Sequence, residues 1–337
     1  MQFSLFGARP LFDPQTLGRR TREWRDDPIP SLQEKARSIV EFSKEVQRIT
    51  GNSRSRARVK ETELEQGFNR AFFVELLGYK IFPGQDESWT AWPKPKSADT
   101  GLSGEPDLLL GQRGRDAFET AAVVELQRPG TPLDGPQPSY HGRSPVEQAF
   151  DYASNLPACR WVIVTDMRIV RIYSIASPEQ YHEIDLQSDS NLPSLDSFDQ
   201  AYRMLAFENL IAGGADAPTS RLLAACQELQ ASIRDGFYEI YANIRSELVG
   251  AIEQWSAGRH SRHRIVFAAQ RLLDRLLFVY FCEHHPDRLL PANLVKDVAE
   301  RAIMSPGGSL HKVYDGMKAL FHDLDVGVKT RRWELPR

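Results

Sequence analysis

EPDLLL (residues 105–110) and AAVVELQ (residues 121–127) are two short apolar runs that each carry an acid. Such runs are typical of buried strands, and the turn-forming residues 111–116 between them predict an antiparallel hairpin that brings Asp107 close to Glu125. Two buried carboxylates repel each other and are costly unless a cation compensates their charge. The pair therefore predicts a site for Mg²⁺, which prefers oxygen ligands, with Mn²⁺ as a substitute. A cation held there would assist the hydrolysis of a phosphodiester.

Pro106-Asp107 followed by Glu125-Leu126-Gln127 resembles the signature of the PD-(D/E)XK nucleases, in which the acid pair binds metal and the last position is usually lysine. The resemblance implies that Asp107 and Glu125 are metal ligands. This chain has glutamine at the last position. Glutamine can orient a water or a phosphate by hydrogen bonding, but it supplies neither charge nor a base. We therefore expect Gln127 to orient water or phosphate, and slow or absent cleavage is the alternative.

The sequence after the acids extends this resemblance. Residues 144–153 read SPVEQAFDYA, and two strand-like runs follow at 160–166 and 170–173. This order is similar to the nuclease region of type IIG restriction-modification enzymes and, more distantly, of type I restriction subunits. In those families a Ser-Pro-x-x-Gln-x-x-x-Tyr helix follows the metal site, which implies that Gln148 lies near the catalytic residues. A solvated polar residue is the other interpretation, and Ser144 with Glu147 fits a capping box without any catalysis.

An amphipathic helix is predicted over residues 60–77, because apolar residues recur there at helical spacing before Gly78. The resembled families place a glutamate on such a helix, facing the metal. Glu61 and Glu65 share a face with Phe68 and Phe72, so both are candidates. An acidic first turn favoured by the helix dipole explains them equally well.

Double-stranded DNA is the expected substrate, but a net charge of −3 means that any surface for it must be local. Basic residues close in sequence to the proposed site are the candidates for phosphate contacts. They are Arg56, Arg58, Lys60, Lys94, Lys96 and Arg128. Ordinary surface basic residues are the alternative interpretation.

The predicted fold is α/β, a restriction-endonuclease-like mixed sheet flanked by helices, followed by an all-α connector domain. The expected domains are an N-terminal helical extension over 1–50, the nuclease domain over 51–190 and the helical connector over 191–337. Within the connector, apolar spacing predicts helices over 201–211, 219–251, 264–283 and 291–303. Residues 269–283 carry the likeness to the type IIG connector. That connector leads into an adenine methyltransferase domain whose Asn-Pro-Pro-Tyr-type motif this sequence lacks, which suggests a truncation, a split gene or an engineered fragment.

The three cysteines share no Cys-x-x-Cys spacing, which indicates a reducing compartment. No stretch approaches the length needed to cross a bilayer, so we expect a cytoplasmic chain without a membrane partner. The predicted function is a Mg²⁺-dependent endonuclease of a restriction-modification or phage-defence system. Cutting both strands with one metal site per chain would require a transient dimer on DNA or two successive nicks. The alternatives are a non-catalytic DNA-binding or docking module that recruits a separate DNA methyltransferase and specificity subunit, and a decayed fragment of such an enzyme.

Overall fold

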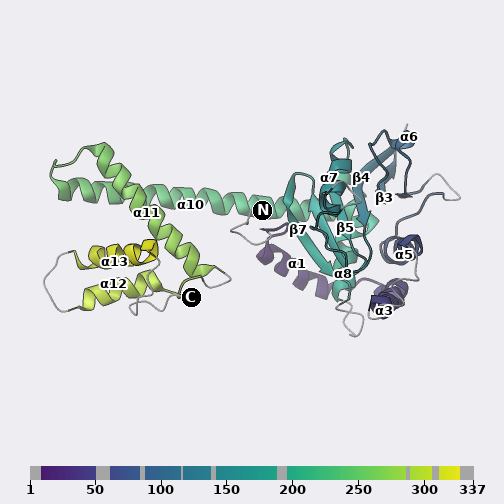
Figure 1. The fold of residues 1–337 in the computed structure, drawn as a ribbon, viewed down its shortest axis with the longest axis horizontal. Helices are drawn as coiled ribbons and strands as arrows, with labels where there is room; N and C mark the ends of the chain where they lie inside the picture. The colour runs from purple at the N-terminus through teal and green to yellow at the C-terminus, as the bar shows by residue number, and fades with distance from the viewer. Residues whose placement is uncertain are drawn as a thin grey trace. The chain divides into compact units, whose positions relative to one another are not determined.

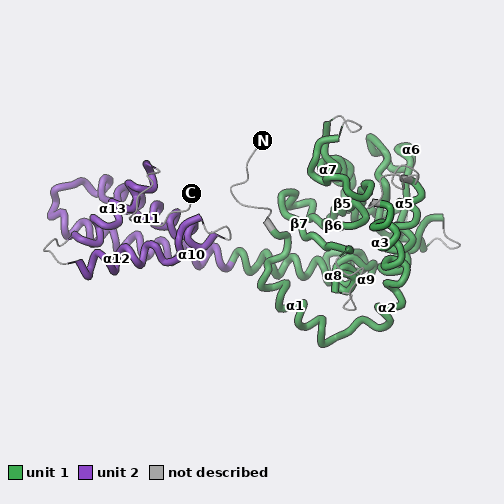
Figure 2. Tube along the Cα trace, turned by 60° about the horizontal axis from the view of Figure 1, so that its bottom comes forward, with its two compact units in different colours: residues 1–231 green, residues 232–337 purple. Residues whose placement is uncertain are grey.

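A computed structural model describes residues 9–50, 61–83, 88–114, 117–137, 142–187, 196–285, 289–305 and 311–326. The chain is mixed α/β and divides into two compact units, residues 1–231 and 232–337 (Figures 1 and 2). The first unit contains the sheet. Within the described residues, the second unit contains only helices.

One mixed sheet of seven strands, in the order β1-β7-β6-β5-β4-β3-β2, forms the centre of the first unit (Figure 1). The strands are β1 (Arg9–Pro10), β2 (Ala91–Pro93), β3 (Leu108–Arg113), β4 (Phe118–Leu126), β5 (Trp161–Thr165), β6 (Ile169–Ser174) and β7 (Ser177–Asp185). The pairs β4–β5 and β1–β7 are parallel, and the other neighbours are antiparallel. The predicted mixed sheet flanked by helices is therefore confirmed.

The β3–β4 hairpin is also confirmed, with Leu108 opposite Val124 and Leu109 opposite Val123. The register shifts between Leu110 and Gly111. A Cβ at Gly111 would lie 2.1 Å from the carbonyl oxygen of Glu119, so only glycine fits this close approach. The hairpin thus fixes which residues of the two strands face each other.

Both faces of the sheet are buried at the central strands β4 and β5, and the alternation along the strands assigns each side chain to a face. Leu110 and Val124 belong to one apolar core, which includes Phe68 and Phe72. Leu109, Val123 and Val162 belong to a second core with Ala149 and Ala153 of α7 (Pro145–Ser154). Asp107 lies two residues before Leu109 and Glu125 two residues after Val123, so the same alternation places both acids on the α7 side.

The remaining helical elements of the first unit are distributed along its sequence. They are α1 (Pro14–Asp26), α2 (Leu32–Lys35), α3 (Arg37–Thr50), α5 (Glu61–Phe68), the π-helix η1 (Asn69–Leu76), α6 (Ser97–Thr100), α8 (Asp196–Leu205), α9 (Phe207–Leu210) and the 3₁₀-helix η3 (Gly214–Asp216). The helix α10 (Pro218–Ser256) starts in this unit and continues into the second.

The helix expected before Gly78 is present, but its second half is a π-helix. The amide of Leu77 donates to the carbonyl of Phe72, five residues earlier, at 3.0 Å. In this wider turn the sequence neighbours Phe72 and Phe73 are both fully buried. Gly78 follows with a φ of +77°, as expected for the residue after a helix C-terminus.

The single helix expected over residues 201–211 is wrong, because α8 ends at Leu205 and α9 begins at Phe207. Side chains from elsewhere bind the last carbonyls of α8. The Tyr79 hydroxyl donates to Leu205 at 2.8 Å, and the Thr219 hydroxyl donates to Met204 at 2.7 Å. These tertiary hydrogen bonds replace the helical ones that sequence periodicity predicts.

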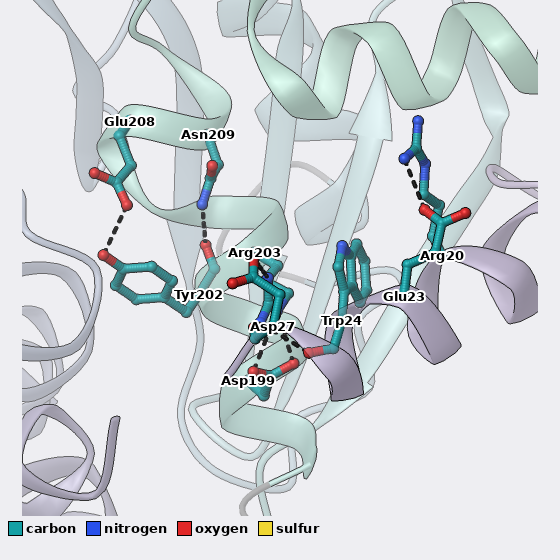
Figure 3. A network of polar contacts seen from close by, with 9 residues as sticks. All are labelled: Arg20, Glu23, Trp24, Asp27, Asp199, Tyr202, Arg203, Glu208 and Asn209. Carbon is teal, nitrogen blue, oxygen red and sulfur yellow. Dashed lines mark hydrogen bonds and ion pairs between the residues drawn. The ribbon is translucent and has the colours of Figure 1, made fainter. Parts of the chain in front are cut away.

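The N-terminal segment belongs to the first unit, where polar contacts join α1 to α8 (Figure 3). Arg203 donates to the carbonyl oxygen of Trp24 at 3.1 Å and pairs with Asp199 at 3.1 Å. Tyr202 donates to Glu208 at 2.8 Å and accepts from Lys35 at 2.9 Å. These contacts hold the first two helices beside α8.

The second unit has a core of its own, built from α11 (Arg262–His284), α12 (Leu294–Met304) and α13 (Lys312–Val326). Of these, α13 was not expected from the sequence. The units divide within α10 rather than near residue 191, because Leu222 and Cys226 of α10 pack into the sheet core. Across the described part of the chain, no helix has the length and apolar character needed to span a membrane.

Candidate metal centre

The acid pair lies at the end of the β3–β4 hairpin. Asp107 immediately precedes β3, and Glu125 is the second-last residue of β4. Continuing the observed register by one pair from Leu108 and Val124 sets Asp107 opposite Glu125. The amide of Leu126 donates to Oδ2 of Asp107 at 2.8 Å, which fixes that carboxylate against β4. The predicted juxtaposition is therefore present.

Glu125 is the most strongly perturbed member of the pair. Its side chain is buried, and its Oε2 atom has no hydrogen-bond partner. Burial raises its pKa well above the usual value, and the negative charges of Asp107 and Glu65 raise it further. The positive charge of Lys94 opposes this shift. A buried carboxyl oxygen without a partner, next to other acids, is suited to binding a cation.

Glu65 is the glutamate that α5, the helix expected before Gly78, contributes to the site. It is buried in α5, and its Oε2 lies 2.5 Å from Nζ of Lys94. The same Nζ lies 3.9 Å from Oδ1 of Asp107. Glu61 is the first residue of α5, and its side chain lies outside the described structure. The charge of Glu65 is close enough to raise the pKa of Glu125.

Gln148 approaches the pair from α7, as predicted. The capping box at the start of this helix is formed: the amide of Glu147 donates to Oγ of Ser144 at 3.2 Å, and the amide of Ser144 donates to Glu147 at 2.8 Å. One turn later, Nε2 of Gln148 donates to the Tyr152 hydroxyl at 3.0 Å. The Oε1 atom of Gln148 is buried without a partner.

An open cavity of about 750 Å³ joins these side chains. The acids Asp107 and Glu125 line it together with Gln148 and Tyr152 of α7. Its outer part includes Glu105, Arg143 and Asp151, of which the last two form an ion pair. The cavity gives a polar ligand access to both acids.

Gln127 does not line this cavity. It is buried, and its backbone amide donates to the carbonyl oxygen of Thr165 at 2.7 Å. In its side chain, Oε1 accepts a hydrogen bond from Nε2 of Gln137 at 3.0 Å. The side chain is thus held by the loop that follows β4. This arrangement gives no support to the prediction that Gln127 orients water or phosphate.

The predicted DNA-binding residues are not all described. Arg56, Arg58 and Lys60 lie outside the described residues. Lys96 and Arg128 are exposed. Lys94 is half-exposed and directed at the acids rather than at solvent alone, a placement that its position in a basic cluster did not indicate.

The acids fit a hard cation better than a softer one. Over the described ranges, no group of three or more His, Cys, Asp and Glu side chains is arranged to hold a metal ion. Mg²⁺ commonly uses one or two protein carboxylates and keeps several waters, and two carboxylates are what Asp107 and Glu125 offer. The partnerless Oε2 of Glu125 is consistent with that donor set.

Comparison of the chain with protein families, curated proteins and solved structures gives no match. The resemblance to restriction nucleases consequently depends on the sequence motifs alone.

Proposed function

We propose that this chain is a Mg²⁺-dependent endonuclease that hydrolyses double-stranded DNA in a restriction-modification or phage-defence system. The observation that carries the proposal is the acid pair: Glu125, buried with a free carboxyl oxygen, lies opposite Asp107 at an open cavity of about 750 Å³. Mn²⁺ replaces Mg²⁺, and a transient dimer on DNA accounts for cutting of both strands.

In this proposal Asp107 and Glu125 hold the metal, which when bound neutralises phosphate charge and activates water. The Leu126 amide keeps the Asp107 carboxylate in place. Tyr152 accepts the hydrogen bond of the Gln148 amide group and thereby directs the free Oε1 of Gln148 into the site, where it accepts a hydrogen bond from water or substrate. The burial of Glu125 keeps competing water away from one side of the pair.

Supercoiled unmethylated DNA is the first substrate to test. We expect the purified chain to nick it in Mg²⁺ or Mn²⁺ and to be inactive in EDTA. The Asp107→Ala variant should nick at least about 100-fold more slowly, since alanine has no oxygen to hold the metal. Nicking by Asp107→Ala at the wild-type rate would point to a contaminating nuclease. No nicking by the wild-type chain in either metal would overturn the proposal.

A docking module is the second candidate function. It is favoured by the large apolar side chains exposed in the second unit, among them Phe237, Ile240 and Ile244 of α10 and Phe278 of α11. Such side chains are typical of surfaces that bind another protein, here a separately encoded methyltransferase and specificity subunit. If the chain is a docking module, the Asp107→Ala variant should bind that subunit as tightly as the wild type does. If it is a nuclease, this substitution should abolish cleavage.

A further inference from the structure

The proposed site has no cationic side chain at the position where the resembled nucleases carry one. Gln127 occupies that position, and hydrogen bonds to the loop after β4 and to β5 hold it away from the cavity. A phosphodiester undergoing attack carries additional negative charge on its equatorial oxygens, and a fixed cation lowers the energy of that state. A cationic side chain from another part of the chain would add such a charge to that of the metal.

Lys94 brings a positive charge to the acid pair from the neighbouring edge strand. It directly follows β2, which pairs antiparallel with β3 so that Pro93 lies opposite Leu108. The amide of Lys94 donates to the carbonyl oxygen of Asp107 at 3.0 Å, so the backbones of the two residues are locked together. Its ammonium group lies 2.5 Å from Glu65 and 3.9 Å from Asp107.

The backbone at Lys94 is held in an unfavourable conformation. Its φ is +42°, in the left-handed region that residues other than glycine rarely adopt because it is energetically unfavourable for them. A glycine would remove this cost and the side chain with it. A strained residue that points its charge at a polar cluster is more typical of a functional position than of a surface loop.

We propose that Lys94 is the catalytic lysine of this site, supplied by β2 instead of β4; the inference rests on the proposed nuclease function. Its ammonium group stabilises the charge on the phosphate while a water oxygen forms a bond to phosphorus and the bond to the leaving deoxyribose oxygen breaks. The attacking water loses one proton to solvent, and the leaving oxygen gains one. Glu65 orients the ammonium group.

Lys94→Met is the informative variant, because it removes the charge and keeps a long, unbranched side chain. We expect the nicking rate in Mn²⁺ to fall at least about 100-fold, as for the loss of one fixed group that stabilises developing charge. Lys94→Arg, which keeps the charge, should retain more activity than Lys94→Met. Lys44→Met, at an exposed position of α3, is the matched control and should nick at the wild-type rate.

Two binding measurements separate catalysis from other roles. Mn²⁺ titration by calorimetry should show that Lys94→Met still binds the metal. The affinity of Lys94→Met for DNA in Ca²⁺ should stay within about threefold of wild type, with the same salt dependence. If Lys94 only contacted a backbone phosphate, its removal would instead reduce the salt slope by about 1.

Each other outcome has one interpretation. Nicking by Lys94→Met at the wild-type rate overturns the role of Lys94 and leaves the nuclease intact. Loss of Mn²⁺ binding, or a weaker DNA complex with a lower salt slope, also overturns it, in favour of a structural or a phosphate-binding lysine. A wild-type chain that nicks DNA in neither metal overturns the nuclease function itself.

Discussion

Glu125 carries an energetic cost that other residues of the fold must offset. It is buried on a central strand, one of its oxygens has no partner, and two further acids lie close enough to raise its pKa. Leaving a buried polar group unsatisfied costs about 1–3 kcal/mol. A protein that only needed a stable strand would place an apolar side chain there, as it does at Val123 and Leu126.

The pH dependence of stability tests this cost. Because the folded-state pKa of Glu125 is raised, its protonated form stabilises the fold below the unfolded pKa of about 4.3, and this contribution is lost as the pH rises through the folded pKa. We expect Glu125→Gln to be stabilised relative to wild type more at pH 8 than at pH 4, in urea unfolding with EDTA. Glu119→Gln, at the exposed end of β4, is the control. If the stability difference between Glu125→Gln and wild type were equal at both pH values, the prediction would be contradicted. In a separate measurement, Mn²⁺ should stabilise wild type more than Glu125→Gln.

At the scale of the element, α7 carries Gln148 to the acids and depends on its first turn for its position. The capping box satisfies backbone groups at the helix N-terminus, where Ser144 is buried. Ala149 and Ala153 on the inner face are fully buried, so the helix packs closely against β4 and β5. A loosened first turn would therefore move Gln148 as well as destabilise the fold.

Replacing the cap measures its contribution. We expect Ser144→Ala to lower the free energy of unfolding by about 1 kcal/mol, because the backbone amide of Glu147 loses the side-chain oxygen that accepts its hydrogen bond. Ser154→Ala, at the exposed end of the same helix, should change stability by less than about 0.5 kcal/mol. Chemical denaturation of both variants checks the prediction, and equal effects at the two ends would show that the cap is not the stabilising feature.

At the scale of the whole molecule, the two units have separate cores. The sheet packs against clusters that reach only as far as Cys226 along α10, whereas Leu320 and Val298 belong to a cluster made of helices α11 to α13. Separate cores allow one unit to open without the other.

Hydrogen exchange distinguishes the two cores. Leu320→Ala should destabilise the second unit by about 2–5 kcal/mol and raise exchange in α11, α12 and α13 only, because Leu320 is fully buried there. Leu110→Ala, at an equally buried position of β3, should instead raise exchange in the sheet. Faster exchange in β3 and β4 of the Leu320→Ala variant would show that the units unfold together.

Local pattern was sufficient for those features that neighbouring residues determine. The apolar runs around Asp107 and Glu125 predict the hairpin, and the Ser144 and Glu147 pair predicts the start of α7, because a turn or a cap depends on residues close in sequence. Helical spacing alone reduced the candidates for the glutamate near the acid pair to two, Glu61 and Glu65. The residues of the acid pair were thus predictable without knowledge of the fold.

Tertiary structure decided whatever depends on distant segments. The end of α8 is set by hydroxyl groups of Tyr79 and Thr219, which the periodicity around residue 205 does not contain. Lys94 looks like one surface lysine among several in the sequence, and only the pairing of β2 with β3 and a left-handed φ direct its charge toward the acids. Sequence determined which acids meet, because a hairpin is local. The packing of the edge strand β2 and of α5 against that hairpin determined that the ammonium group of Lys94 joins them.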